Sequence, residues 1–173
     1  MWDIATLADL ADIFSGAAVV GGIIFAAVQI REFRAQRREA VTVELMRTFS
    51  EPELATALNL IRSLPDGLSG EDVRARGPEF ERAATMLATT YEAIGLLAFR
   101  GMTSFSIVRS LTGGIALTTW NKLKPWMEMI RAEQNQPSFA EWYQWLADQL
   151  ARDSDRHEAT PAYTRFANAR PRH

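Results

Sequence analysis

The chain contains no cysteine and only two histidines, and each shortage excludes certain catalytic and metal-binding sites. Without cysteine the protein has no disulfide, no thiolate nucleophile and no Cys-ligated zinc. Both histidines, His157 and His173, lie in a polar C-terminal stretch. Nucleophilic catalysis requires an activated side chain beside a base, and metal hydrolysis requires clustered His and carboxylate ligands, and the sequence provides neither. It therefore predicts no enzyme, no metal site and no cofactor.

The chain also has little net charge. Its 19 basic and 21 acidic residues leave a formal charge of −2, and the one dense basic cluster spans residues 31–38. A nucleic-acid-binding protein carries a broad basic patch as its electrostatic footprint. No nucleic-acid partner is therefore expected.

What the chain does have is a long apolar run, from Ile13 to Ile30, with no charged residue and with Gln29 as its only strongly polar side chain. As a helix the run covers roughly 27 Å, and the turns before it extend this to the ~30 Å of a hydrocarbon core. A buried core helix seldom runs this long without a polar face, and a secretory signal begins with a basic segment. The run therefore predicts a transmembrane helix.

Charges on the two sides of the run predict its orientation, because Lys and Arg stay on the cytoplasmic side of a membrane. Acidic residues precede the run, and the residues after it include Arg31, Arg34, Arg37 and Arg38. We expect the N-terminus to lie outside and the C-terminal domain to lie in the cytoplasm. These arginines can also bind anionic lipid headgroups, so membrane lipids are expected partners.

Small residues recur along the run at spacings that place them on common helix faces. One stripe holds Ala17 and Gly21, and a neighbouring stripe holds Ala18, Gly22 and Ala26. Such stripes let two membrane helices approach closely. We expect the partner to be another membrane protein or a second copy of the chain, although small residues are also simply frequent in membrane helices.

The rest of the sequence predicts an all-α protein whose N-terminal transmembrane helix continues into a cytoplasmic helical bundle. A narrow stripe of Phe33, Val41, Leu45 and Phe49 predicts an amphipathic helix that packs on a domain and ends near Ser50. The expected organisation is a leader at 1–12, the span at 13–30, its continuation at 31–49, the bundle at 50–152 and a polar tail at 153–173.

Within the bundle, capping-box spacing predicts helix starts at Ser50 with Glu53 and at Ser138 with Glu141. A turn is expected at Leu64 to Gly70, followed by a core helix from Pro78 to Arg100 that Gly101 closes. A further helix is expected from Thr103 or Ser104, then one from Ile115 to about Ala132 with a kink at Pro125. The Gly113-Gly114 pair lacks a phosphate-binding motif, so it indicates close helix packing. The expected core positions are Leu54, Leu58, Ile61, Leu87, Tyr91, Ile94, Leu97, Phe105, Val108, Trp120, Leu123, Trp126, Ile130, Phe139, Trp142, Trp145, Leu146 and Leu150.

Glu92 is the one carboxylate on the apolar face of the expected core helix. Glu92 could have one of three roles: a general acid, a metal ligand or one half of an ion pair. Because buried charges are generally paired, and no second ligand stands at metal-binding spacing, we expect an ion pair with an arginine such as Arg100 or Arg109.

Several short segments form a recognisable set. They are the span ending in Gln29-Ile30-Arg31, the segment Tyr91 to Leu97 closed by Arg100-Gly101-Met102, Gly113-Gly114 with Trp120 and Leu123-Lys124-Pro125, and the helix with Phe139, Trp142 and Trp145 to Ala147. Together they resemble a bacterial family of small membrane-anchored proteins, known only as domain of unknown function four-seven-six-zero. With the charge pattern around the span, this resemblance implies the bacterial inner membrane as the location. The resemblance covers most of the chain from Ala11 to Leu150. It implies one span and a helical cytoplasmic domain, and it brings no activity or functional residue.

Two functions fit these expectations. The first is a single-pass membrane protein that acts as an interaction or accessory subunit through its span and its helical domain. The alternative is a homo-oligomeric pore or membrane effector, which would turn Asp12 and Gln29 towards a channel. Because both residues lie near the ends of the span and nothing near its centre is polar, we favour the interaction module.

Overall fold

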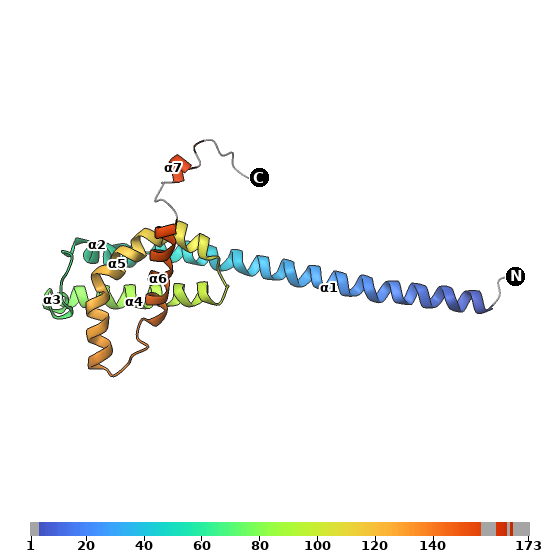
Figure 1. The fold of residues 1–173 in the computed structure, drawn as a ribbon, viewed down its shortest axis with the longest axis horizontal. Coiled ribbons are helices and arrows are strands. Elements are labelled where there is room, and N and C mark those ends of the chain that lie inside the picture. Colours follow the sequence, from blue (N-terminus) through green and yellow to red (C-terminus); the bar gives the residue numbers. More distant parts are fainter. Residues whose placement is uncertain (1–3, 157–161, 166, 168–173) are drawn as a thin grey trace. The chain divides into compact units, whose positions relative to one another are not determined.

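The computed structural model describes residues 4–156, 162–165 and 167, and gives only the backbone at 4–18, 34–39, 155–156, 162 and 165. All regular secondary structure in these residues is helical, in seven helices (Figure 1). This confirms the all-α prediction. The chain divides into two compact units, Met1–Val41 and Thr42–His173.

Helix α1 runs without a break over Ile4–Phe49, as predicted from the absence of a helix breaker before Ser50. Proline at position 52 restricts the preceding residue to extended backbone, which prevents the helix from continuing. The predicted capping box is wrong, however. Glu51 is the residue at the N-cap of α2, whereas the Ser50 hydroxyl donates backwards to the Met46 carbonyl at 3.0 Å.

The side chains of the first unit are described at residues 19–33 and 40–41. Across the described part of the chain, no helix is both long enough and apolar enough to cross a membrane. The predicted span at residues 13–30 therefore has no support from this criterion. The side chains of residues 13–18 and those of the leader lie outside the described residues.

The second unit is a bundle built around α4. Helix α4 packs against α2 and α6, and α5 packs against α2, α3, α4 and α6. The bounds are α2 Pro52–Ser63, α3 Gly70–Ala75, α4 Pro78–Phe99, α5 Phe105–Glu133 and α6 Glu141–Arg156, with the short α7 at Ala162–Arg165. Because α6 extends to Arg156, the last turn of the bundle includes Asp153, which the sequence assigned to the tail.

Helical periodicity located the core well. Among the expected positions the structure buries Leu54, Ile61, Leu87, Tyr91, Ile94, Val108, Trp120, Leu123, Trp126, Ile130, Leu146 and Leu150. The others in the bundle are half-buried. On α1, Leu45 is buried and Phe49 packs against the ring of Tyr91 with a centroid separation of 6.3 Å, whereas Phe33 is 61% exposed.

Two helices differ from their predictions. Ser69 and Asp72 form a true capping box that starts the short helix α3 inside the expected turn region. The two expected helices after Ser104 are one helix, α5, which runs through Gly113 and Gly114 and contains Pro125. Figure 1 shows α5 turning between its yellow first part and its orange last part. An internal proline bends a helix in this way, because it removes one backbone donor and its ring displaces a carbonyl.

The end of α4 follows the prediction. Gly101 has a φ of +66°, and the Met102 amide donates to the Leu97 carbonyl at 2.9 Å. This is a Schellman ending, which favours glycine because a side chain at positive φ meets the backbone. It reverses the chain between α4 and α5 and so sets both helices side by side.

Candidate functional site

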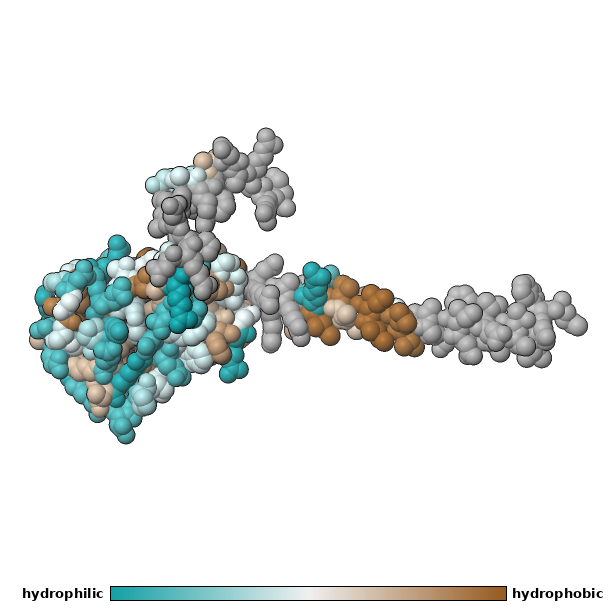
Figure 2. Space-filling model, viewed as in Figure 1, coloured by the Kyte–Doolittle hydropathy of each residue, from teal (hydrophilic) through white to brown (hydrophobic). Residues whose placement is uncertain are grey.

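The apolar surface of α1 is the first candidate site. Every described side chain from residue 19 to residue 33 is exposed. The large apolar side chains among them, which are 47–65% exposed, are Val19, Val20, Ile23, Ile24, Phe25, Val28, Ile30 and Phe33. Figure 2 shows them as a brown apolar surface between two grey segments. A patch of this kind marks contact with a lipid or a protein partner.

The small residues predicted to pack in the membrane lie within this surface. Gly21, Gly22 and Ala26 are exposed, and a Cβ added to either glycine would meet no atom within 4 Å. The side chains of Ala17 and Ala18 lie outside the described residues. Both glycines therefore leave room for another helix, and the packing role remains a prediction.

The predicted headgroup-binding arginines are only partly described. The side chain of Arg31 is exposed, which suits a contact with lipid headgroups. Those of Arg34, Arg37 and Arg38 lie outside the described residues.

Glu92 on α4 belongs to a second arrangement, at the junction of α4 with α6. Its Oε2 accepts hydrogen bonds from the backbone N–H groups of Trp142 and Tyr143, both at 2.9 Å. These groups lie in the first turn of α6, where backbone donors have no partner within their own helix. Burial raises the pKa of Glu92 above its ordinary value, while the two backbone hydrogen bonds act in the opposite direction. Glu92 therefore caps α6 from a neighbouring helix.

This arrangement corrects two predictions. Glu92 does not use Arg109 as its partner, because Arg109 donates to Asp153 on α6 at 2.6 Å. Ser138 does not cap α6 with its side chain either. Its carbonyl accepts from the Glu141 amide at 3.2 Å, and the carboxylate that serves the α6 N-terminus comes from α4.

Gly95 stands one turn after Glu92 on the same face and permits this contact. A Cβ on Gly95 would lie 2.7 Å from the carbonyl carbon of Trp142, and closer still to its oxygen. No real side chain fits there without moving the backbone of α6. Glu92 and Gly95 therefore work together, because the absent side chain lets α6 come close enough for the carboxylate to reach its amides.

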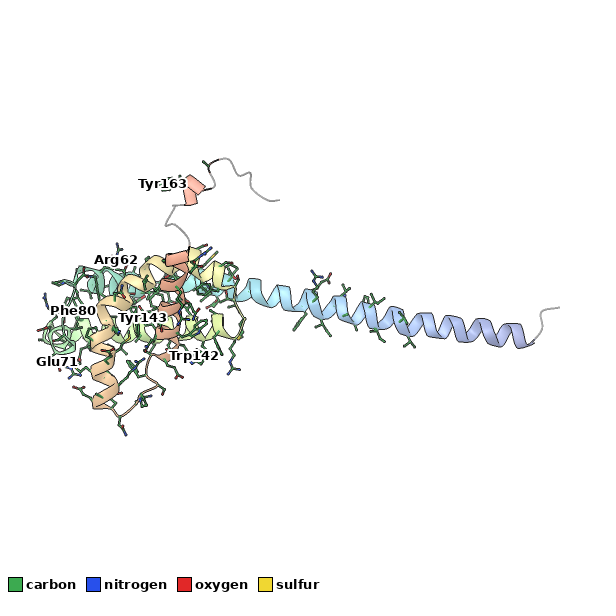
Figure 3. The ribbon with its side chains drawn as sticks, in the orientation of Figure 1. Arg62, Glu71, Phe80, Trp142, Tyr143 and Tyr163 are labelled. Atoms are coloured by element: carbon green, nitrogen blue, oxygen red, sulfur yellow. The ribbon has the colours of Figure 1, made fainter. Side chains whose placement is uncertain are left out.

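Buried hydroxyl groups join the same helices deeper in the bundle. Tyr91 shares a hydrogen bond of 2.8 Å with Thr112, and Tyr143 shares one of 2.7 Å with Thr119. The two tyrosine rings stack at 4.7 Å, and Tyr143 also donates to the Ala116 carbonyl. Burial raises the pKa of Tyr91 to about 12 and that of Tyr143 well above its ordinary value. Figure 3 shows Tyr143 inside the bundle. The two tyrosine hydroxyls therefore link α4 and α6 to α5 inside the bundle.

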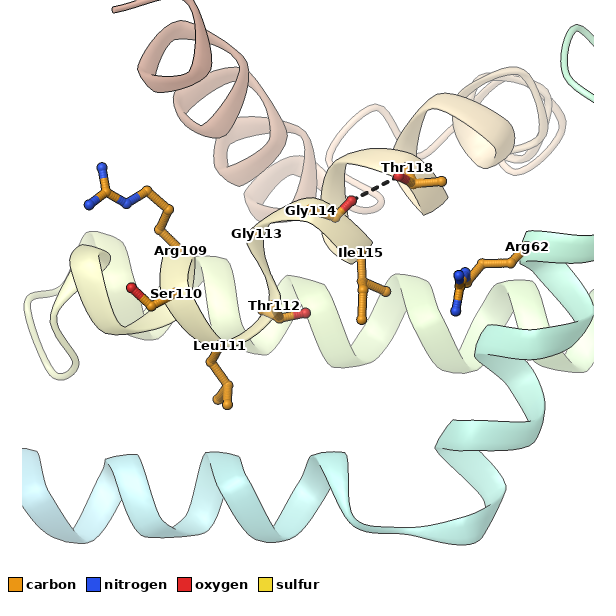
Figure 4. A pocket seen from close by; sticks show the side chains of 9 residues that line it. All are labelled: Arg62, Arg109, Ser110, Leu111, Thr112, Gly113, Gly114, Ile115 and Thr118. Carbon is orange, nitrogen blue, oxygen red and sulfur yellow. Dashed lines mark hydrogen bonds between the residues drawn. The ribbon is translucent and has the colours of Figure 1, made fainter. Parts of the chain in front are cut away.

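A pocket of about 400 Å³ lies beside the glycine pair of α5 (Figure 4). Its lining is Arg62, Arg109, Ser110, Leu111, Thr112, Gly113, Gly114, Ile115 and Thr118. Most of its polar groups already have partners: Arg109 binds Asp153, Thr112 binds Tyr91, and Thr118 donates to the Gly114 carbonyl. Gly113 would place a Cβ 3.0 Å from Leu150, which confirms the predicted close packing at that glycine. Gly114 contributes no such contact.

The sequence interpretation missed Gly95, Thr112, Thr119 and the partner of Glu92. Gly95 falls on the apolar face of α4, beside Tyr91 and Ile94. A glycine on an apolar helix face indicates that another helix can approach closely there, so the sequence did contain this signal. The threonine positions carry no signal in sequence, because their partners lie 21 and 24 residues away. Among the described residues, no three His, Cys, Asp or Glu side chains gather into a group that could hold a metal ion.

No curated protein and no solved structure matches the chain. One protein family does: Domain of unknown function (DUF4760) matches residues 17–150, from within the apolar run of α1 to Leu150 in α6. The matched range contains the Glu92 and Gly95 junction and the glycine pair of α5. It agrees with the family that the sequence motifs indicated. This chain belongs to the DUF4760 family.

Proposed function

We propose that this protein is a membrane-anchored interaction module. Residues 13–30 cross the bacterial inner membrane, the N-terminus lies outside, and the helical bundle acts in the cytoplasm as the interaction or accessory part. The observation that supports the proposal is the exposed surface of α1 from Val19 to Ile30, which is apolar apart from Gln29.

The apolar side chains of this surface point in every direction around α1. A helix that packs on a globular protein buries one apolar stripe and presents a polar face to water. Here Val19, Val20, Ile23, Ile24 and Phe25 alone cover most of the circumference, because successive residues are ~100° apart. Burying a Val or Ile side chain contributes about 1.5–3 kcal/mol. Transfer of this surface into lipid is therefore favourable by on the order of 10 kcal/mol.

The sequence extends the same apolar character to Ile13, with no charged residue between Ile13 and Ile30. Arg31 begins the basic cluster directly after the run, and its side chain is exposed. An exposed cation at this boundary suits the headgroup region on the cytoplasmic side. Both features favour a helix that spans the membrane with the bundle inside.

Several polar side chains of the bundle join one helix to another. Glu92 caps α6, Arg109 pairs with Asp153, and Arg74 makes a two-pronged contact with Glu133 at 2.7 Å for each hydrogen bond. Side chains used in this way fix one rigid helical surface. A rigid surface on an anchored domain suits binding of a protein partner.

Fractionation of bacterial membranes tests the anchor. The full chain should sediment with membranes and remain there after washing with alkaline carbonate, which removes peripheral proteins. An Ile24→Lys, Phe25→Lys variant should move largely to the supernatant, because a charge in the hydrocarbon core costs about 2.5–3.5 kcal/mol. Val43→Lys is the matched control, since Val43 is 65% exposed on α1 outside the run. Release of the unaltered chain by carbonate would disprove the proposal.

A further inference from the structure

One face of the first unit carries side chains at alternating spacings of three and four residues. Val19, Gly22, Ala26, Gln29 and Phe33 follow this spacing, and Ala40 continues it one heptad beyond Phe33. All six residues are exposed. A repeat that averages 3.5 residues defines a straight seam along which two helices wrap around each other. We call these six residues the α1 seam.

We propose that the α1 seam pairs in parallel with the same seam of a second copy of this chain. The inference rests on the proposed function, because insertion into one membrane gives every copy the same orientation. In a parallel pair each seam residue lies opposite its own counterpart across the two-fold axis. The seam spans about 32 Å at 1.5 Å per residue, which is long enough to join the copies along the apolar run and beyond it.

Gln29 identifies the second copy as the occupant. It is the one strongly polar side chain between Ile13 and Ile30, and it faces outward from the helix. Its amide is both a donor and an acceptor. Two Gln29 side chains facing each other therefore satisfy each other's donor and acceptor across the pair.

The small residues of the seam fit the same arrangement. Gly22 and Ala26 allow two backbones to approach, and a Cβ at Gly22 meets no atom within 4 Å of this chain. Gly21 has equally open surroundings but lies about 100° around the helix from Gly22, off the seam. The pair therefore provides an internal control, since only one of two adjacent glycines should matter.

The absence of native cysteine makes disulfide scanning a clean test. Single variants of the full chain are oxidised in native membranes and separated without reductant. Gly22→Cys, Ala26→Cys and Gln29→Cys should form disulfide-linked dimers at least about fivefold more than Gly21→Cys, Ile24→Cys and Val28→Cys, because a disulfide requires Cβ atoms ~4 Å apart. With Ala40→Cys as the reporter, adding Gly22→Leu should reduce dimer about tenfold, since it holds the helices apart, whereas Gly21→Leu should not.

The same membrane samples separate the two proposals. Variants that sediment with membranes but crosslink equally at all positions, or at none, would overturn the parallel seam while leaving the anchor intact. A product whose mass differs from twice that of the chain would also overturn it, because the occupant would then be another protein. Recovery of the unoxidised chains in the supernatant would instead remove the membrane anchor on which the seam rests.

Discussion

The carboxylate of Glu92 lies 2.9 Å from the backbone nitrogen of Tyr143, although 51 residues separate them. A helix usually obtains its N-terminal acceptor from a residue directly before it. Here α4 supplies the acceptor to α6, so docking of the two helices and capping of α6 are one event. The bundle therefore depends on this junction for the position of its last helix.

Loss of the Glu92 carboxylate should weaken the bundle. Glu92→Ala leaves two amides of α6 without their acceptor, and a lost N-terminal cap costs about 0.5–2 kcal/mol. Glu92→Gln keeps one acceptor oxygen and should cost less. Thermal unfolding of the full chain in mild detergent, followed by circular dichroism, measures both. Glu128→Ala is the control, because its exposed pair with Lys124 at 3.9 Å contributes little. Equal stability of Glu92→Ala and Glu128→Ala would contradict the capping role.

Two glycine variants should change stability in opposite directions. Gly95→Ala introduces a Cβ into the backbone of Trp142 and should lower the free energy of unfolding by about 1–3 kcal/mol, as overpacking does. Gly114→Ala meets no atom within 4 Å and should raise it by up to about 1 kcal/mol, because alanine favours a helix. The same unfolding assay compares them. A stabilising Gly95→Ala would show that α6 does not approach α4 this closely.

Alkaline pH should unfold the bundle through its buried tyrosines. The pKa of Tyr91 is raised to about 12 from 10.0. The contribution of Tyr91 to folding stability is therefore complete below the pKa of the unfolded chain, and it is lost as pH rises through the pKa of the folded protein. A shift of this size corresponds to on the order of 3 kcal/mol. In the Tyr163→Phe variant, where Tyr91 and Tyr143 are the remaining tyrosines, tyrosinate absorbance should rise together with loss of helical circular dichroism. Tyrosinate formation near pH 10 with the helices intact would rule out this burial.

Local sequence patterns predicted the helices and their buried faces because these depend on periodicity. Leu87, Tyr91 and Ile94 on α4 and Leu146 and Leu150 on α6 are spaced for one helix face, and the structure buries all five. The end of α4 at Gly101 was predictable for a similar reason, since the positive φ favours glycine.

Features that join distant segments were not predictable in this way. Glu92 was expected to pair with an arginine, because the sequence does not reveal which amides a carboxylate meets after folding. Ser50 matched a capping pattern, but its hydroxyl bonds within α1. The continuity of α5 through Gly113 and Gly114 was missed because two glycines usually weaken a helix. The close approach of Gly113 to Leu150 could not be read from the sequence.

Labelling of single cysteines with a membrane-impermeant maleimide tests the central claim most directly. Asn59→Cys lies on the exposed side of α2 and should be labelled in lysed spheroplasts but not in intact ones. Ile24 is 59% exposed in the structure. Ile24→Cys should nevertheless remain unlabelled in intact and in lysed spheroplasts until detergent is added, because lipid covers it. Labelling of Ile24→Cys in lysed membranes without detergent, or of Asn59→Cys in intact spheroplasts, would contradict a membrane-anchored protein with a cytoplasmic bundle.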